Sequence, residues 1–166
     1  MEKVIRLIYC LLIFALILTI PSCRSGQNYL TENEKTQIIE EVKERMHQAF
    51  EAEKSLDVNR MIEIYANREG FVFGGDGYLT TDFDYLSDSF TTWANSMENW
   101  LWLNSHDEYV YVLSKDAAAY SFEFDWAILT EKGDTLKCKQ GSWTFVLKKI
   151  NGEWKSIHCN GTHIYE

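Results

Sequence analysis

Three side chains that could bind a metal, attack a substrate or carry a proton stand close together near the end of the chain. His158, Cys159 and His163 lie within the run SIHCNGTHIYE. Histidine and cysteine together can hold a zinc ion, and a cysteine beside a histidine can act as a nucleophile with its base. Which of these side chains can meet depends on the elements that position them.

A β-hairpin is expected to position this cluster. The dipeptide Asn151-Gly152 stands between two runs rich in β-branched and aromatic residues, and it favours a two-residue turn. Such a turn pairs Phe145 with His158 and Thr144 with Cys159. Because side chains alternate along a strand, one face of the hairpin should share the orientation of His158. That face would hold Trp143, Phe145, Leu147, Trp154, Ser156, His158, Asn160 and Thr162.

The same register separates the three candidate ligands. Cys159 and His163 fall on the opposite face, so His158 can meet neither of them. Cys159 and His163 are four residues apart, ~13 Å along a strand, which is too far for one zinc ion. The sequence therefore predicts no metal site and no Cys–His nucleophile here. The rest of the opposite face would be Ser142, Thr144, Val146 and Ile157.

Cys138 and Cys159 are expected to be free thiols. On this register they lie about 20 Å apart along the sheet. A disulfide requires Cα atoms about 4.4–6.8 Å apart. The same alternation of side chains places Cys138 on the same face of the sheet as Cys159.

If the alternation of side chains continues through the EKGD loop into the preceding strand, the face that holds His158 is strongly aromatic. The same alternation sends Glu123 and Asp125 to the other face. His158 is then either a general acid or base in an apolar pocket, or a buried histidine that hydrogen-bonds Asn160 and closes the core. The lack of an inward carboxylate on these strands counts against the enzyme. The aromatic residues added to this face are Tyr120, Phe122, Phe124 and Trp126.

The first half of the domain reads as helices. Thr31 and Glu34 form a capping box ahead of an apolar series that predicts a long helix over about 32–54. Asp57 is expected to cap a short second helix. A third helix is expected over about 82–98.

A short hairpin and then four strand-like segments complete the pattern. GFVFGGDGYL predicts two brief strands around a turn, and the segments EYVYVLS, AAAYSFEFDWAILT, LKCKQGSWTFVLKK and EWKSIHCNGTHIY predict a sheet. Asp76 in the first turn and Asp82 before the third helix could reach a pocket mouth, although turn formation and helix capping explain them better. The fold class is α+β.

This order of elements resembles the nuclear transport factor 2-like superfamily, in its SnoaL-like branch. The similarity rests on the helices, the FVFGGDG hairpin and the closing GSWTFVLKKINGEWKSIH, and it covers about 34–162. It implies a cone-shaped, curved antiparallel sheet wrapped around the long N-terminal helix, with an apolar pocket inside. We expect the following residues to bind a ligand there: Tyr65, Tyr120, Phe122, Trp126, Trp143, Phe145, His158 and Asn160.

The N-terminus resembles a bacterial lipoprotein signal. Lys3 and Arg6 precede an apolar run that ends in IPSC, and in such a lipobox the cysteine, here Cys23, is lipidated after cleavage before it. We expect a signal peptide over 1–22, a lipidated tether over 23–30 and a SnoaL-like domain over 31–166. The protein would be anchored in the bacterial cell envelope and face the periplasm or the cell exterior.

The net charge and the family resemblance together limit the classes of function to be considered. The formal net charge is −9 and no basic stripe is present, which argues against a nucleic-acid partner. We expect a domain that binds a small apolar molecule or a partner protein, without a cofactor. The alternatives are a small acid–base enzyme of isomerase, cyclase or dehydratase type that uses His158, and a structural module that forms homodimers.

Overall fold

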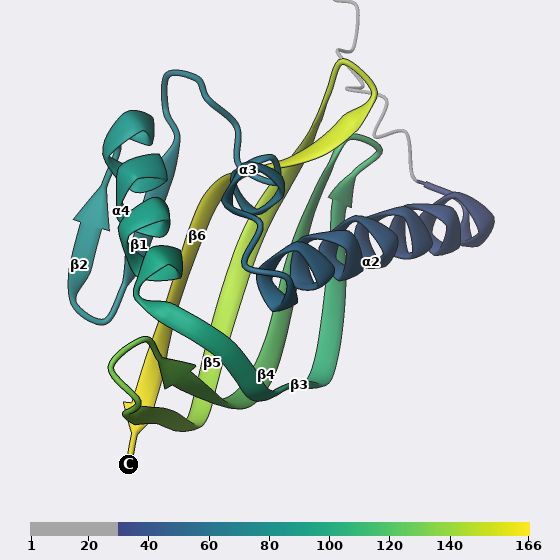
Figure 1. Cartoon of the computed structure of the whole chain (residues 1–166). Helices are drawn as coiled ribbons and strands as arrows, with labels where there is room; N and C mark the ends of the chain where they lie inside the picture. Colours follow the sequence, from purple (N-terminus) through teal and green to yellow (C-terminus); the bar gives the residue numbers. More distant parts are fainter. Residues whose placement is uncertain (1–29) are drawn as a thin grey trace, which may run out of the picture.

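Helices lie against one face of a curved sheet in the computed structural model, which describes residues 30–166 (Figure 1). The long helix α2 spans Glu32–Lys54, as predicted. Its capping box is formed: the Thr31 hydroxyl accepts from the Glu34 backbone N–H at 3.2 Å, and the Glu34 carboxylate accepts from the Thr31 N–H at 2.8 Å. Helix α3 covers Val58–Ile62 behind its cap Asp57. None of the helices in residues 30–166 is long and apolar enough to cross a bilayer.

The remaining helix and the short hairpin sit together at one edge of the sheet. Strands β1 (Val72–Gly75) and β2 (Tyr78–Thr80) form the hairpin, and α4 covers Phe83–Asn95. Asp82 caps α4, because its carboxylate accepts from the Tyr85 backbone N–H at 3.0 Å. The hairpin contacts the helix that follows it through the rings of Tyr78 and Tyr85, whose centroids are 6.0 Å apart.

Six strands form one open sheet in the order β2-β1-β6-β5-β4-β3. The four long strands are β3 (Met97–Ser114), β4 (Ala117–Thr130), β5 (Thr135–Ile150) and β6 (Glu153–Tyr165), and they pair antiparallel. The short β1 pairs with β6 in parallel, which the sequence did not reveal. The predicted α+β architecture, a curved sheet around a long N-terminal helix, is confirmed.

The first part of strand β3 pairs irregularly with β4. Breaks in its pairing with β4 fall between Met97 and Asn99, and between Trp100 and Trp102. Each break inserts an extra residue, so inward side chains recur every third position rather than every second. Met97, Trp100 and Leu103 consequently all face the helices.

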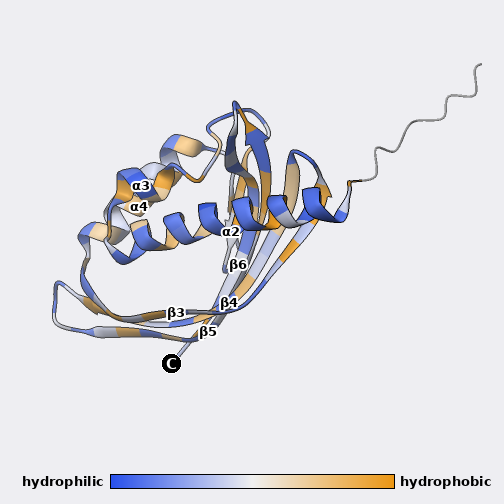
Figure 2. Cartoon of the chain, turned by 90° about the vertical axis from the view of Figure 1, so that its right-hand side faces the viewer, coloured by the Kyte–Doolittle hydropathy of each residue, from blue (hydrophilic) through white to orange (hydrophobic). Residues whose placement is uncertain are grey.

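The helices cover only the concave face of the sheet. Figure 2 shows α2 crossing that face and α3 and α4 beside it, while the outer face of β3, β4 and β5 stays uncovered. The buried core lies between the two layers and includes Val42, Met46, Tyr120 and Leu147. The layers do not close along their whole length, and a cavity remains between them.

The predictions for the signal peptide, the lipidation at Cys23 and all but the last residue of the tether fall on residues 1–29, outside those that the structure describes.

Candidate functional site: an apolar pocket with an Asp–His pair

A cavity of about 540 Å³ lies between the helices and the concave face of the sheet. The C-terminal half of α2 forms one wall, with Met46, Phe50 and Glu53. Helix α4 and the start of β3 form a second wall. The sheet forms the third, and the lining drawn from α4, β3 and the sheet includes Phe90, Trp93, Met97, Trp100, Leu103, Phe122, Phe124, Trp126, Trp143, Phe145, His163 and Tyr165.

Two glycines allow an indole ring to lie flat on the sheet in this cavity. A Cβ atom on Gly161 would collide with the ring of Trp143, and one on Gly75 would lie 3.0 Å from it. The Trp143 ring also contacts Phe73, with 5.2 Å between ring centroids. The absence of side chains at these glycines therefore creates a flat aromatic surface.

The turn between β1 and β2 delivers a carboxylate to the cavity. Asp76 and Gly77 both have positive φ angles, 50° and 83°, as a two-residue turn of type I′ requires. The Asp76 carboxylate accepts from the backbone N–H of His163 at 2.7 Å, and its other oxygen lies 2.7 Å from Nδ1 of the His163 ring. These contacts fix an aspartate–histidine pair between the hairpin and β6.

Aromatic rings surround the His163 side chain, which is 18% exposed. Its ring stacks on Tyr165 with 5.6 Å between centroids and meets the edges of Phe124 and Trp126 at 5.2 and 5.9 Å. Since Nδ1 faces a carboxylate, it carries the proton in the neutral ring, and the lone pair is on Nε2. Nε2 is on the other side of the ring from Asp76 and has no hydrogen-bond partner among the described residues, and His163 lines the cavity.

The electrostatics of Asp76 reflect its contact with His163. Partial burial acts to raise the pKa of Asp76, but the hydrogen bonds from the ring and backbone of His163 outweigh it, and the pKa is lowered. Asp76 is therefore ionised at neutral pH. The ionised carboxylate at Nδ1 fixes the orientation and the tautomer of the histidine ring.

Glu53 is a second ionisable group in the wall. It follows Met46, Ala49 and Phe50 on the inner face of α2, and all four line the cavity. Burial raises the pKa of Glu53 to about 7, and no neighbouring group opposes this effect. A half-buried carboxyl group thus titrates near neutrality inside an otherwise apolar wall.

The predicted positions of His158 and Asn160 are wrong. Val146 pairs with His158 but Leu147 pairs with Ser156, so Ile157 is an extra residue in β6. This bulge shifts the register by one and reverses every later side chain. His158 and Asn160 point to the exposed outer face, and neither lines the cavity.

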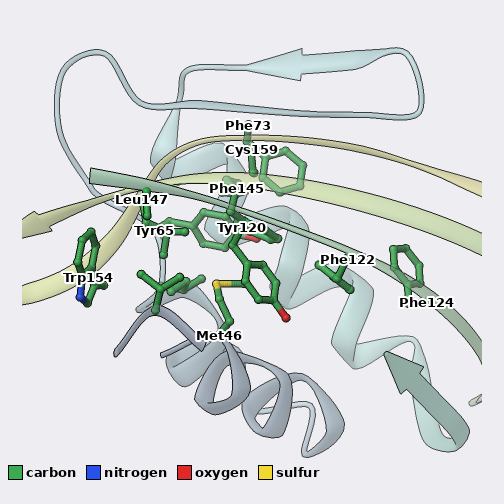
Figure 3. Close-up of a cluster of buried hydrophobic side chains, with 14 of the residues drawn as sticks. Met46, Tyr65, Phe73, Tyr120, Phe122, Phe124, Phe145, Leu147, Trp154 and Cys159 are labelled. Carbon is green, nitrogen blue, oxygen red and sulfur yellow. The ribbon is translucent and has the colours of Figure 1, made fainter. Parts of the chain in front are cut away.

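Because of the bulge, Cys159 and His163 point inward in place of His158 and Asn160. The bulge lies where β6 stops exchanging hydrogen bonds with Ile64 and Ala66 through Ser156 and begins to pair with β1. Cys159 pairs with Phe73 and is fully buried (Figure 3). The expectation that Cys159 and His163 face outward is therefore wrong.

The prediction that the two cysteines are free thiols is confirmed, although both point to the opposite face of the sheet from the one predicted. Cys138 and Cys159 are both free and buried. The outward orientation expected for Cys138 is wrong, because a second bulge lies in β5, between the partners of Phe124 and Trp126, and turns Cys138 inward. Burial raises the pKa of the Cys159 thiol to about 12, so this thiol stays protonated.

Most of the predicted ligand-binding residues do reach the cavity. Tyr120 does not, because it is fully buried in the core near Met46, and its hydroxyl has no hydrogen-bond partner in the described part of the chain (Figure 3). Ligand binding by the others stays a prediction. Those that line the cavity are Tyr65, Phe122, Trp126, Trp143 and Phe145.

Sequence reasoning gave Asp76 little weight, put His163 on the outer face and missed Glu53. Glu53 stands three and seven residues after Phe50 and Met46, a spacing that marks it as a member of the apolar face of α2. Asp76 stood out only as a turn residue. No signal in the sequence located the bulge that turns His163 inward. Within residues 30–166 no three histidine, cysteine or carboxylate side chains converge on a possible metal position.

The two carboxylates of β4, Glu123 and Asp125, lie on the outer face of the sheet, as predicted. Asp125 accepts from Trp102 Nε1 at 2.8 Å and lies 2.6 Å from His106 Nε2. These bonds lower the pKa of Asp125, with His106 as the main cause. The group faces away from the cavity and takes no part in it.

Comparison with known proteins identifies the fold. No family model matches the sequence. No curated protein matches it either. Solved structures match over most of their length. An NTF2-like superfamily protein from Salmonella enterica has a TM-score of 0.69 at 15% identity and covers 80% of this chain and 94% of its own.

Two further structures carry names of enzymes. A proposed scytalone dehydratase from Novosphingobium aromaticivorans has a TM-score of 0.71 at 9% identity, over 81% of this chain and 89% of its own. A ketosteroid isomerase-like protein from Erwinia carotovora atroseptica has a TM-score of 0.64 at 16% identity, over 75% and 94%. Identities this low establish the fold alone. The chain has the nuclear transport factor 2-like fold that the sequence resemblance predicted.

Proposed function

We propose that this domain binds a small, largely apolar molecule in the cavity and moves a proton on it through His163. The observation that carries the proposal is the geometry of His163: its Nδ1 is held 2.7 Å from the Asp76 carboxylate while its ring lies among aromatic side chains of the cavity. A histidine held in this way presents the lone pair of Nε2 to the cavity.

The proposed step is proton transfer between a C–H or O–H group of the ligand and Nε2 of His163. Asp76 would stabilise the imidazolium that forms, and the same ring would return the proton to another atom of the ligand. Low polarity in the cavity strengthens the interaction between the two residues. Proton removal and return are the elementary steps of isomerisation and dehydration, and structural neighbours named as isomerase-like and as a proposed dehydratase fit this class.

Exchange of α-protons on a small bicyclic ketone tests the proposal. The purified protein is incubated with 2-tetralone in D2O, and the loss of the α-proton signals is followed by NMR. We expect the protein to accelerate exchange, and the His163→Gln variant to lose most of the acceleration, about 10²–10⁴-fold. The matched control is His158→Gln, which removes an exposed histidine of the same strand outside the cavity.

Two results bear on the alternatives. Binding of 2-tetralone without faster exchange in the wild type would indicate a binding domain with no chemistry of this kind. Equal acceleration by wild type and His163→Gln would refute the role of His163.

We further propose that Cys23 is lipidated and that the domain is anchored in a bacterial envelope. The support is the IPSC motif after an apolar run. Growth of an expressing bacterium with a clickable palmitate analogue should label the wild type. Cys23→Ser should stay unlabelled, and equal labelling of both proteins would reject the lipobox.

Homodimerisation through the outer face is a second candidate. Tyr109, Tyr111 and Leu113 alternate along β3 and are exposed by 67%, 72% and 54%. A row of large apolar side chains on an uncovered sheet face often marks an interaction surface. Light scattering would show a dimer for the wild type and a monomer for Tyr111→Glu, whereas a monomeric wild type would exclude this candidate.

A further inference from the structure

Glu53 has a position that proton transfer at His163 does not explain. It lies on the cavity side of α2, in register with the apolar residues Met46 and Phe50. Burial is the only cause of its raised pKa. Among the other titratable groups that line the cavity, Tyr65 responds to the charge of Glu53, which contributes to the raised pKa of the Tyr65 hydroxyl. An unpaired carboxyl group in an apolar wall destabilises the fold unless something binds it.

Aromatic rings lie next to this carboxyl group. The indole N–H of Trp100 donates to the backbone carbonyl of Glu53 itself, at 2.9 Å, which fixes the ring beside the residue. Trp93 packs against Trp100 with 5.7 Å between ring centroids. Phe50 is one helical turn before Glu53, and all of these side chains line the same cavity.

We propose that this end of the cavity binds a protonated amine carried by the apolar ligand, with Glu53 as its counter-ion and the rings of Phe50, Trp93 and Trp100 around it. The inference rests on the proposed small-molecule function and specifies its ligand class. Aromatic faces attract organic cations, most strongly when water is excluded. A carboxylate beside them supplies the opposite charge and accepts the N–H bonds.

The proton balance of binding distinguishes this ligand from a neutral one. With a pKa near 7, Glu53 is partly protonated in the empty cavity at pH 6.5. An ammonium group favours the ionised form, so binding should release a proton and tighten as the pH rises through 7. A neutral carbonyl ligand would instead need the protonated acid as donor, and its binding would weaken over the same range. The overall negative charge also favours a cation.

The test compares three probes with the same apolar body. They are 2-(2-naphthyl)ethylamine, its trimethylammonium derivative and 2-(2-naphthyl)ethanol, each measured with the purified protein by calorimetry at pH 6.5 and 8. We expect the amine to bind about tenfold or more tightly than the alcohol at pH 8. The quaternary derivative, which cannot donate a hydrogen bond, should keep part of this preference through the rings. Glu53→Gln should remove the preference of the protein for the amine over the alcohol.

A matched variant controls for the net charge of the protein. Glu40→Gln removes one carboxylate from the exposed side of the same helix and should leave the preference intact. Equal affinity for amine and alcohol, or a preference that survives Glu53→Gln, overturns the amine inference while the pocket proposal stands. Failure of all three probes to bind overturns both.

Discussion

Replacement of Glu53 by glutamine should stabilise the ligand-free protein, and only at neutral and alkaline pH. Glutamine has nearly the same shape as glutamate but cannot ionise. The pKa of Glu53 is about 7 in the folded protein and 4.5 in the unfolded reference. Below pH 4.5 the residue is protonated in both states, and its ionisation contributes nothing to the difference between them.

The direction of the pH dependence follows from the difference between the folded and unfolded pKa values of Glu53. Between pH 4.5 and 7 the unfolded chain loses the Glu53 proton while the folded protein keeps it, so the free energy of unfolding falls as the pH rises. Above pH 7 the penalty is complete. Each tenfold difference in proton affinity is worth about 1.4 kcal/mol, which sets an upper value of about 3 kcal/mol. Water entering the open cavity reduces it, and we expect about 2 kcal/mol.

Urea unfolding of the wild type and Glu53→Gln at pH 5 and pH 8.5 measures the effect. The variant should be more stable by about 2 kcal/mol at pH 8.5 and by less than about 1 kcal/mol at pH 5. Glu40→Gln, on the exposed side of α2, should show no such pH dependence. A Glu53→Gln effect that is the same at both pH values, or a loss of stability at pH 8.5, would refute the reasoning.

Other positions give further predictions. His158→Ala should change the free energy of unfolding by less than about 0.5 kcal/mol in thermal melting, because the side chain is exposed; a loss of about 2 kcal/mol would contradict the inverted register of β6. Gly161→Ala should destabilise the protein by about 1–3 kcal/mol in urea, because its Cβ would collide with the Trp143 ring; unchanged stability would show that the ring can move away. Cys138 and Cys159 should react with a thiol reagent only after denaturation, without prior reduction, and a mass two hydrogens lower in the unreduced protein would reveal a disulfide instead.

Local patterns predicted the elements well. The capping box at Thr31 and the apolar spacing after it predicted the bounds of α2, and the turn residues predicted the β1–β2 and β5–β6 hairpins. These signals act within a few residues, where sequence and geometry are tightly linked. The inward orientation of Phe122 and Trp143 followed from the same alternation.

The residues that we propose for acid–base chemistry could not be predicted in the same way, because a single bulge in β6 determines which histidine faces the cavity. An extra residue at Ile157 exchanges His158 for His163 as the inward histidine. The bulge lies next to the hydrogen bonds of Ser156 with Ile64 and Ala66, which are distant in sequence. The role of Asp76 depends on where His163 arrives, so it could not be recognised from the hairpin alone.

An NMR titration of the histidine ring nitrogens tests the central claim most directly. The chain has four histidines, and His163 lies in the cavity while His158 lies on the outer face. In long-range ¹H–¹⁵N spectra of the free protein at neutral pH, the neutral His163 ring should carry its proton on Nδ1. Addition of 2-tetralone should shift the resonances of His163, Nε2 most strongly, and leave those of His158 in place. A shift of His158 with no change at His163 would contradict both the register of β6 and the proposed site.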